Sequence, residues 1–511
     1  MHYVKKSVKF DSDKLDLEAA LDKAGFGLYG FLLTCLTSLI LISFSCIAYG
    51  SPFIVPTSAC ELKTTSSQQG MLASGTIISL LIGGVIWSYL ADTRGRRAML
   101  LIALLGASVL NIIATISVNW IMLLVFQVLA GLFAAGIYSV SMTLLSESIP
   151  MAYRNTTVLI VSSVMMLAQG IMALLAIPII PLRFSHYLPS LGIYMNSWRT
   201  LMLVYSAPAV ICAVCLFFTQ ESPKFIFNKK DDIKALEALR AIHRINNWRS
   251  KEDFQLKGLV KDESLQSTDN ASVKDQILPL LQAPFLKYTI IMLFMNVGQQ
   301  LTAFVVWMPT IANQFVRIIQ TGDSTDLTVC DILNSGSAPV NPDETPCALN
   351  ETSLLILLGV GGLQSVFNLI ISFLVNFVGR RNISIIVIML CGGSGILVNL
   401  VPNVFASATL FCIMLLGAVV VGLCTTICVA LFPTNLRAMA IAFTMVAQYL
   451  GIVASIQILN WLLKVNCAAG FYFFGTLYIS AAVAAFFLPD DRTLQPTEPT
   501  TTEVENSEKK T

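Results

Sequence analysis

Charged residues are scarce in this chain. Lysine, arginine, aspartate and glutamate make up 12% of its 511 residues, whereas apolar residues make up 55%. About 25% of the residues of a soluble globular protein are charged, so this composition excludes that class. The formal net charge of +2 gives no reason to expect nucleic acid as a partner. We therefore predict a protein that lies in a membrane.

Histidine is rarer still, and no catalytic grouping is recognisable. The three histidines, His2, His186 and His243, all lie outside the long apolar runs. No nucleophile stands in a pattern with a general base, as covalent catalysis requires. We expect no enzyme, no metal site and no cofactor.

Cysteine is present, but not as a disulfide framework. Most of the twelve cysteines lie inside apolar runs, where a free thiol behaves as a small hydrophobic group. These are Cys35, Cys46, Cys212, Cys215, Cys391, Cys412, Cys424 and Cys428.

Long apolar runs, in contrast, are abundant. A helix needs about 20 apolar residues to cross a bilayer, and twelve stretches come close to this length. Six precede a polar central segment and six follow it, which predicts an all-α membrane protein with twelve transmembrane helices. The expected spans are 28–50, 70–90, 98–117, 121–146, 156–180, 200–219, 286–315, 353–377, 383–402, 407–431, 438–464 and 469–488.

Lysine and arginine are concentrated on one side of the predicted spans. That side includes the N-terminal tail, the central segment and two short basic loops, whereas the opposite side holds Lys63, Arg183 and little else. Basic residues in short loops stay in the cytoplasm, so both termini are expected there. The predicted organisation is a cytoplasmic tail (1–27), a first six-helix bundle (28–219), a cytoplasmic connector (220–285), a second bundle (286–489) and a disordered tail (490–511).

The loop between spans 7 and 8, residues 319–352, is then extracytoplasmic. It contains a sequon that begins at Asn350, where we predict glycosylation. It also contains Cys330 and Cys347, which are candidates for a disulfide in an oxidising compartment, with Cys60 and Cys467 as alternative partners.

One loop signature occurs twice, at 92–97 and at 376–381. The first copy is followed by Glu147, Pro150 and Arg154, and the second by Ala430, Pro433 and Arg437 at the same internal spacing. The repeat predicts two halves built on one plan. The second copy lacks the acids, because Asn376 and Ala430 stand where the first has Asp92 and Glu147.

Six spans, a connector, six more spans and a basic loop after spans 2 and 8 resemble the major facilitator superfamily. Other motifs are similar to its sugar porter and organic ion transporter branch. They are Glu147-x-x-Pro150-x-x-x-Arg154, Trp198-Arg199, Glu221-Ser222-Pro223-Lys224 and Pro433-x-x-x-Arg437. The resemblance implies two pseudo-symmetric six-helix bundles that rock about a central substrate site.

A narrower resemblance is to the synaptic vesicle glycoprotein 2 family and its transporter relatives. It rests on residues 17–27, on 235–246 and on Val306-Trp307-Met308-Pro309, although the tail and the loop after span 7 are shorter here. The resemblances imply a secondary transporter, and we expect its substrate to be a small neutral or modestly polar organic solute because the spans contain few ionisable groups. The alternative is a vesicle membrane protein that binds or traffics without transport. We expect a monomer in the bilayer of the plasma membrane or of an intracellular vesicle.

By the same resemblance, charged groups at the cytoplasmic ends of the spans form a latch that holds the outward-open state. For the arginines of the second half we consider two kinds of partner, lipid phosphate and the acids of the first half. Alternatively, these arginines only fix the topology. The expected latch residues are Asp92, Arg94, Arg96, Arg97, Glu147, Arg154, Glu221, Arg380, Arg381 and Arg437.

Between their ends, the predicted spans contain essentially no ionisable side chain. This disfavours proton coupling through a buried carboxylate and a deep counter-ion for a strongly charged substrate. Gln299-Gln300 resembles the glutamine pair by which sugar porters bind hydroxyls, although Val305 stands where their asparagine would follow. Buried amides often bond to neighbouring helices instead. The candidate substrate contacts are Gln299, Gln300, Trp307, Gln169, Tyr138, Gln364, Gln448 and Tyr449.

Overall fold

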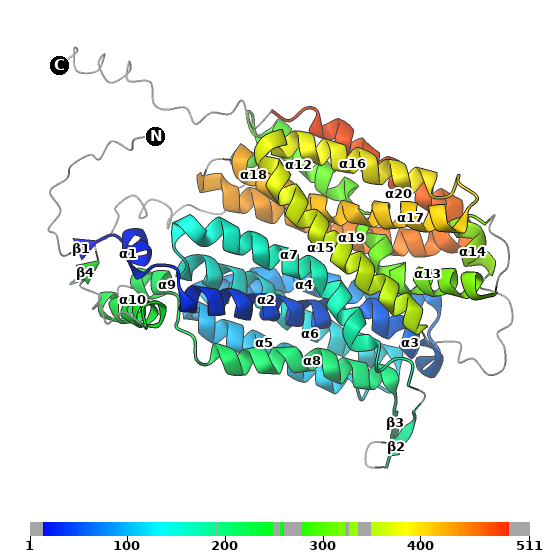
Figure 1. Cartoon of the computed structure of the whole chain (residues 1–511), viewed down its shortest axis with the longest axis horizontal. Helices are drawn as coiled ribbons and strands as arrows, with labels where there is room; N and C mark the ends of the chain where they lie inside the picture. Colours follow the sequence, from blue (N-terminus) through cyan, green and yellow to red (C-terminus); the bar gives the residue numbers. More distant parts are fainter. Residues whose placement is uncertain are drawn as a thin grey trace.

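The described part of the chain consists mostly of helices, as Figure 1 shows for this computed structural model. Within the described residues, twelve helical stretches are long and apolar enough to cross a membrane, which confirms the predicted fold class. The structure describes residues 14–182, 184–189, 192–229, 231–248, 256, 258–259, 278–321, 327–335, 349–432 and 434–489.

The first span is longer than the sequence suggested. It consists of α2 (Leu28–Ala48) and α3 (Ser51–Leu62), so the predicted end at residue 50 is wrong. Pro52 stands in the first turn of α3, where a proline costs no hydrogen bond and its fixed φ favours a new helix. The other spans of this half are α4 (Ser66–Arg94), α5 (Arg96–Ala114), α6 (Trp120–Ser148), α7 (Met151–Ala176) and α8 (Ser197–Leu216).

The second half also begins with an interrupted span. The seventh span is divided into α12 (Leu286–Gly298) and α13 (Thr302–Thr321), with Gln299 and Gln300 at the break. Interrupted helices at matching places in two halves are a general sign of a transporter's binding site. The remaining helices are α15 (Glu351–Val378), α16 (Arg380–Leu397), α17 (Val404–Leu415), η3 (Leu416–Val419), α18 (Val420–Leu431), α19 (Thr434–Val465) and α20 (Cys467–Ala485).

Short elements gather at the end of the bundle that carries the basic loops, which we call the cytoplasmic end after the charge-based prediction. Figure 1 shows α1, α9 and α10 together there, beside the start of α2. The elements are α1 (Leu17–Ala24), α9 (Pro223–Asn228), α10 (Asp232–Asn246), η2 (Leu278–Leu281) and a parallel pair of β1 (Lys14–Leu15) with β4 (Gly258–Leu259).

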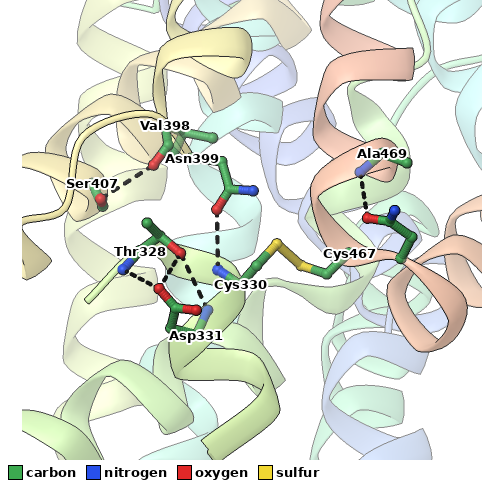
Figure 2. The surroundings of a disulfide bond; sticks show 9 residues. Thr328, Cys330, Asp331, Val398, Asn399, Ser407, Cys467 and Ala469 are labelled. Atoms are coloured by element: carbon green, nitrogen blue, oxygen red, sulfur yellow. Dashed lines mark hydrogen bonds between the residues drawn. A yellow bond between two sulfur atoms is a disulfide. The ribbon is translucent and has the colours of Figure 1, made fainter.

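The opposite, extracytoplasmic end carries a hairpin of β2 (His186–Leu188) and β3 (Ile193–Met195), and the short helix α14 (Val329–Ser335). A disulfide joins Cys330 of α14 to Cys467 at the start of α20, as Figure 2 shows. The first-named pairing of Cys330 with Cys347 is therefore wrong, and one of its alternatives is correct. Cys60 is disulfide-bonded as well, whereas Cys347 lies outside the described residues.

Hydrogen bonds order the chain next to this disulfide. The backbone N–H of Cys330 donates to Asn399 Oδ1 at 3.3 Å. The hydroxyl and the backbone N–H of Thr328 both donate to Asp331, and these bonds lower the pKa of its carboxyl below the ordinary value. The Asn399 bond and the disulfide hold α14 against the extracytoplasmic end of the second half, while the Thr328 bonds order the start of α14 itself.

The contacts between the halves include two seams between long helices. On one seam α7 lies against α15, where Gly361 lies so close to Gly170 that an added Cβ would come within 2.6 Å of its nitrogen. On the other, Gln457 of α19 donates to Ser74 of α4 at 3.0 Å, and Asn460 donates to the Ser66 carbonyl at 2.7 Å. These contacts of both seams lie in the middle and extracytoplasmic parts of the spans.

Candidate functional site

The basic loop after span 2 turns sharply at Gly95. Its φ of 111° is one that residues with a Cβ rarely adopt. A Cβ here would also lie 2.7 Å from Glu221 Oε2. Glu221 accepts from the backbone N–H groups of Arg96 at 3.0 Å and of Arg97 at 2.9 Å, so its charge lies at the N-terminus of α5, where the helix dipole favours an anion.

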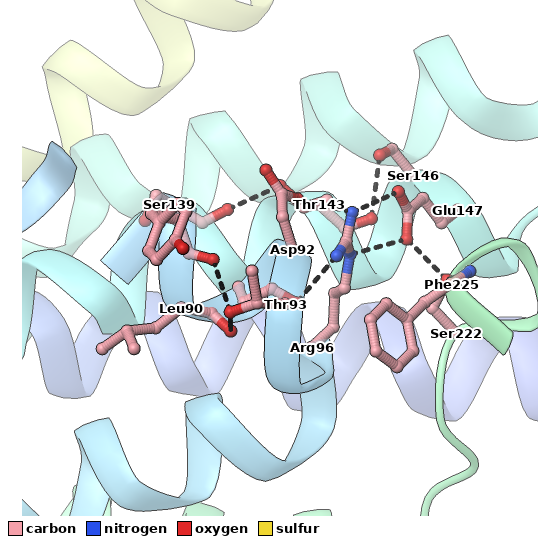
Figure 3. A network of polar contacts seen from close by, with 12 residues as sticks. Leu90, Asp92, Thr93, Arg96, Ser139, Thr143, Ser146, Glu147, Ser222 and Phe225 are labelled. Carbon is pink, nitrogen blue, oxygen red and sulfur yellow. Dashed lines mark hydrogen bonds and ion pairs between the residues drawn. The ribbon is translucent and has the colours of Figure 1, made fainter. Parts of the chain in front are cut away.

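Arg96 is the centre of a charge cluster built from the three spans α4, α5 and α6 and the connector (Figure 3). Its guanidinium pairs with Asp92 at 2.8 Å and with Glu147 at 3.1 Å. It also donates to the Ala91 carbonyl at 2.7 Å, while the Ser222 hydroxyl donates to Glu147. The side chains of Arg96 and Glu147 are 10% and 13% exposed, whereas that of Asp92 is 67% exposed. Glu147 is therefore the acid that solvent screens least.

The other predicted latch residues of the first half lie outside this cluster. Arg94 is exposed at the end of α4. Arg97 donates to the carbonyls of Leu216 and Phe217 at the end of α8. Arg154 pairs with Glu18 of α1 at 2.9 Å.

In the second half, the matching arginines bind backbone groups of that same half. Arg380 donates to the Thr426 carbonyl at 3.2 Å, and Arg381 donates to the Phe486 carbonyl at 2.6 Å. Neither of these two bonds is to an acid of the first half, which was one of the partners considered for these arginines. The Arg437 side chain lies outside the described part of the structure.

Several glutamines of the spans are engaged in helix packing. The Gln300 amide donates to the Asn296 carbonyl at 3.2 Å and accepts from the Ser455 hydroxyl. The Gln364 amide donates to the Leu415 carbonyl at 2.9 Å. Gln169 and Gln448 are half-buried.

Three buried polar atoms in span 7, on Gln299, Trp307 and Gln314, remain without a partner among the described residues. Gln299 is 2% exposed; its amide nitrogen donates to the Cys424 thiol at 2.7 Å, but its carbonyl oxygen accepts no hydrogen bond. The Trp307 indole N–H is also unpaired. Unpaired buried polar atoms are rare in native proteins, so the two glutamine oxygens and the indole N–H leave two acceptors and one donor available in span 7.

Three tyrosines from both halves gather near mid-depth. Tyr49 lies at the break of span 1, Tyr138 in α6 and Tyr449 in α19, and they are close enough to influence one another electrostatically. The Phe44 ring packs against Tyr138 at 5.4 Å and Tyr49 at 5.6 Å between centroids. No hydrogen bond to another described residue engages these three hydroxyls, and 36% of Tyr49 is exposed. We call Tyr49, Tyr138 and Tyr449 the tyrosine cluster.

Sequence reasoning missed Tyr49, because it ends an apolar run that was expected to stop there. It also missed a group at the extracytoplasmic end, where Arg199 is 1% exposed and pairs with Glu61 of α3 at 2.7 Å. Trp198 donates its indole N–H to the same carboxylate at 2.7 Å. The signal available was Glu61 itself, an acid near the end of a long apolar stretch, and the Trp198-Arg199 motif.

Comparisons with known proteins agree with this architecture. The profile of the Major Facilitator Superfamily matches residues 29–318 and 347–510. The chain is 30% identical over 237 residues to "Putative transporter svop-1" of Caenorhabditis elegans, covering 46% of this chain and 43% of that protein. It is 26% identical over 230 residues to "Synaptic vesicle 2-related protein" of Rattus norvegicus, covering 45% and 39%. The matched segments span less than half of these relatives.

Among solved structures, the fold is similar to the inward open conformation of the xylose transporter XylE from E. coli. The TM-score is 0.64 and the sequence identity is 15%, over 94% of this chain and 99% of that chain. At this identity the likeness establishes the fold.

Proposed function

Because the chain belongs to the major facilitator superfamily, we propose that it is a secondary transporter for a small neutral or modestly polar organic solute, working by rocking-bundle alternating access. The seams at Gly170 and Ser74 support this, because they join the halves away from the cytoplasmic end. This is the arrangement expected of a transporter that is closed to the outside and open to the cytoplasm.

The observation that carries the proposal is the tyrosine cluster. Its hydroxyls come from both halves and have no partner among the described residues. A solute that bonds to hydroxyls of both halves would make different hydrogen bonds in different conformations, because a rocking motion changes the distance between Tyr449 and the other two tyrosines. Differential contact with two states is what allows a ligand to shift a conformational equilibrium.

The chemistry of the cluster supports an uncharged solute. Phenol hydroxyls donate and accept hydrogen bonds, and the faces of the rings of Phe44 and the tyrosines offer apolar contact. The unpaired Gln299 oxygen and Trp307 N–H add one acceptor and one donor from span 7. A compact solute with hydroxyl or amide groups on an apolar frame would satisfy these groups.

The test is uptake by the purified chain in proteoliposomes, with radiolabelled D-xylose and a panel of neutral polyols and amides as probes. We expect saturable uptake of at least one probe that survives a protonophore. Changing all three tyrosines of the cluster to phenylalanine keeps the rings and removes the hydroxyls, and we expect the apparent KM to rise about tenfold or more, as each lost hydrogen bond costs about 1 kcal/mol. Tyr187→Phe on the extracytoplasmic hairpin is the matched control.

The same preparation separates transport from the alternative of binding alone. Thermal stabilisation by a probe, without saturable uptake of it, would favour a transporter-fold protein with a binding or trafficking role. Unaltered uptake by the triple phenylalanine variant would show that the tyrosine cluster is not part of the solute site.

A further inference from the structure

The N-terminal helix α1 and the connector helix α10 pack together at the cytoplasmic end, as Figure 1 shows. Leu17 and Leu21 of α1 share a hydrophobic cluster with Leu236 and Leu239 of α10. Burial of these four side chains fastens the connector to the N-terminal segment. We call α1 and α10 the cytoplasmic clamp.

The clamp is fixed to the start of span 1 by Asn246. Its side-chain amide donates to the carbonyls of Ala24 at 3.1 Å and Gly25 at 2.7 Å, and its oxygen accepts from the Tyr29 N–H at 2.9 Å. Gly27 lies directly against this residue, and an added Cβ would come within 2.9 Å of the Asn246 Cβ. The approach is as close as a glycine permits.

The clamp also reaches the start of span 5. The Phe26 ring stacks on Tyr153 of α7, with centroids 4.8 Å apart. Glu18 of α1 accepts from the guanidinium of the next residue, Arg154, at 2.9 and 3.3 Å. The clamp therefore contacts the one arginine of the first-half motif that was expected to join Glu147 in the latch.

Arg154 is incompletely satisfied in this arrangement. Its Nη2 atom donates to Glu18 and weakly to the Ile149 carbonyl, but its Nε is buried and has no partner among the described residues. Both Glu147 oxygens meanwhile accept from Arg96, and one also accepts from Ser222. A buried donor without a partner costs free energy, so the pairing with Glu18 leaves part of the Arg154 guanidinium unsatisfied.

We propose that Glu18 is a positioning residue that draws the Arg154 guanidinium out of the latch and thereby stabilises the state that is closed at the extracytoplasmic seams. When the clamp releases Arg154, its charge becomes available to the cytoplasmic gate, and the equilibrium moves toward the outward-open state. The inference concerns the conformational preference of the chain, so it goes beyond the identity of the solute.

Ser74 offers a reporter of that equilibrium, because it lies on an extracytoplasmic seam where it accepts from Gln457. A Ser74→Cys chain is treated from the extracytoplasmic side with an impermeant maleimide. The labelling of the parent chain, which lacks this cysteine, is measured in the same way and subtracted. Adding Glu18→Gln should raise the labelling rate about two- to fivefold, the range expected for a partly exposed ion pair. Glu18→Asp should keep most of the original rate.

Two comparisons distinguish positioning from a general loosening of α1. Asp22→Asn makes the same charge change at an exposed position of α1, and it should leave labelling unchanged. In an Arg154→Gln background, Glu18→Gln should have no further effect, because there is no guanidinium to release. An unchanged rate in Glu18→Gln, an equal rise in Asp22→Asn, or a rise that persists in Arg154→Gln would overturn the proposal. None of these readouts requires uptake of a solute, so the proposal can fail while the transport function stands.

Discussion

The basic loops of the two halves share a backbone design and differ in their charges. Both turn at a glycine with positive φ, 111° at Gly95 and 86° at Gly379. In both loops an arginine donates to a carbonyl at the end of the last span of its half: Arg97 to that of Phe217 and Arg381 to that of Phe486. Basic side chains commonly satisfy the last carbonyls of a helix, so this shared part fastens each loop to its own bundle.

The two loops differ in the partners of their arginines. Arg96 lies between two carboxylates in the first half, whereas Arg380 donates to a backbone carbonyl in the second. A glycine turn and a helix-capping arginine are therefore sufficient to form the loop, and the acids are an addition of the first half. We infer that the shared features serve folding and topology, and that gating depends on the half that carries the acids.

Arg96→Gln should have the largest effect, because it leaves the buried Glu147 carboxylate without its cation. Removing one partner of a largely buried pair costs about 3 kcal/mol or more. We expect a lower melting temperature of the detergent-purified protein and strongly reduced transport. Arg381→Gln, which removes only a bond to a carbonyl, is the comparison and should cost about 1 kcal/mol. Equal losses would mean that the acids contribute nothing particular to the first half.

Glu147→Gln and Asp92→Asn test separately the two carboxylates that pair with Arg96. Glu147 is 13% exposed and binds both Arg96 and Ser222, so its loss should cost about 2 kcal/mol. Asp92 is 67% exposed, and solvent should limit its contribution to about 0–1 kcal/mol. Glu147→Gln should change the labelling of the Ser74→Cys reporter and the melting temperature more than Asp92→Asn does. The reverse ranking would show that Asp92 acts on the other half in a state not seen here.

Gly95→Ala and Gly379→Ala test the shared backbone. Both glycines combine positive φ with a ψ of about 150°, a conformation that disfavours alanine by about 1–3 kcal/mol. At Gly95 the new Cβ would also meet Glu221 Oε2 at 2.7 Å, so Gly95→Ala should lower the melting temperature more than Gly379→Ala. Equal shifts would indicate that Glu221 moves aside freely.

Features that depend on local composition could be predicted from the sequence. The apolar runs indicated twelve spans, and the repeated Gly-Arg-Arg signature indicated two related halves. The pairings of side chains that are far apart in the chain could not be predicted. Cys330 had three candidate partners, and its disulfide to Cys467 depends on how α14 lies on the bundle. Glu18 and Arg154 are 136 residues apart, and only the packing of α1 on α10 brings them together.

The arginines of the second half show the same limit, because the sequence left several partners open for them. Spacing along the chain indicated where Arg380 and Arg381 lie in their loop, but not the carbonyls that they bind. The substrate candidates behave alike: Gln300 and Gln364 were chosen by residue type, and the structure engages both in packing. Residue type identifies groups that can bond, whereas tertiary packing decides which remain available.

Ala430→Glu should have the smallest effect and is the most direct way to remove the difference between the halves. It restores the acid at the position equivalent to Glu147, on the span whose Thr426 carbonyl binds Arg380. Ala430 is exposed, so a new ion pair there should stabilise the protein by at most about 1 kcal/mol. Because exposed charges are screened by salt, the gain in melting temperature should shrink as the salt concentration rises. Ala430→Gln, which has the same shape without the charge, is the control. A salt-insensitive gain shared by both variants would mean that packing, and not the missing acid, distinguishes the second loop from the first.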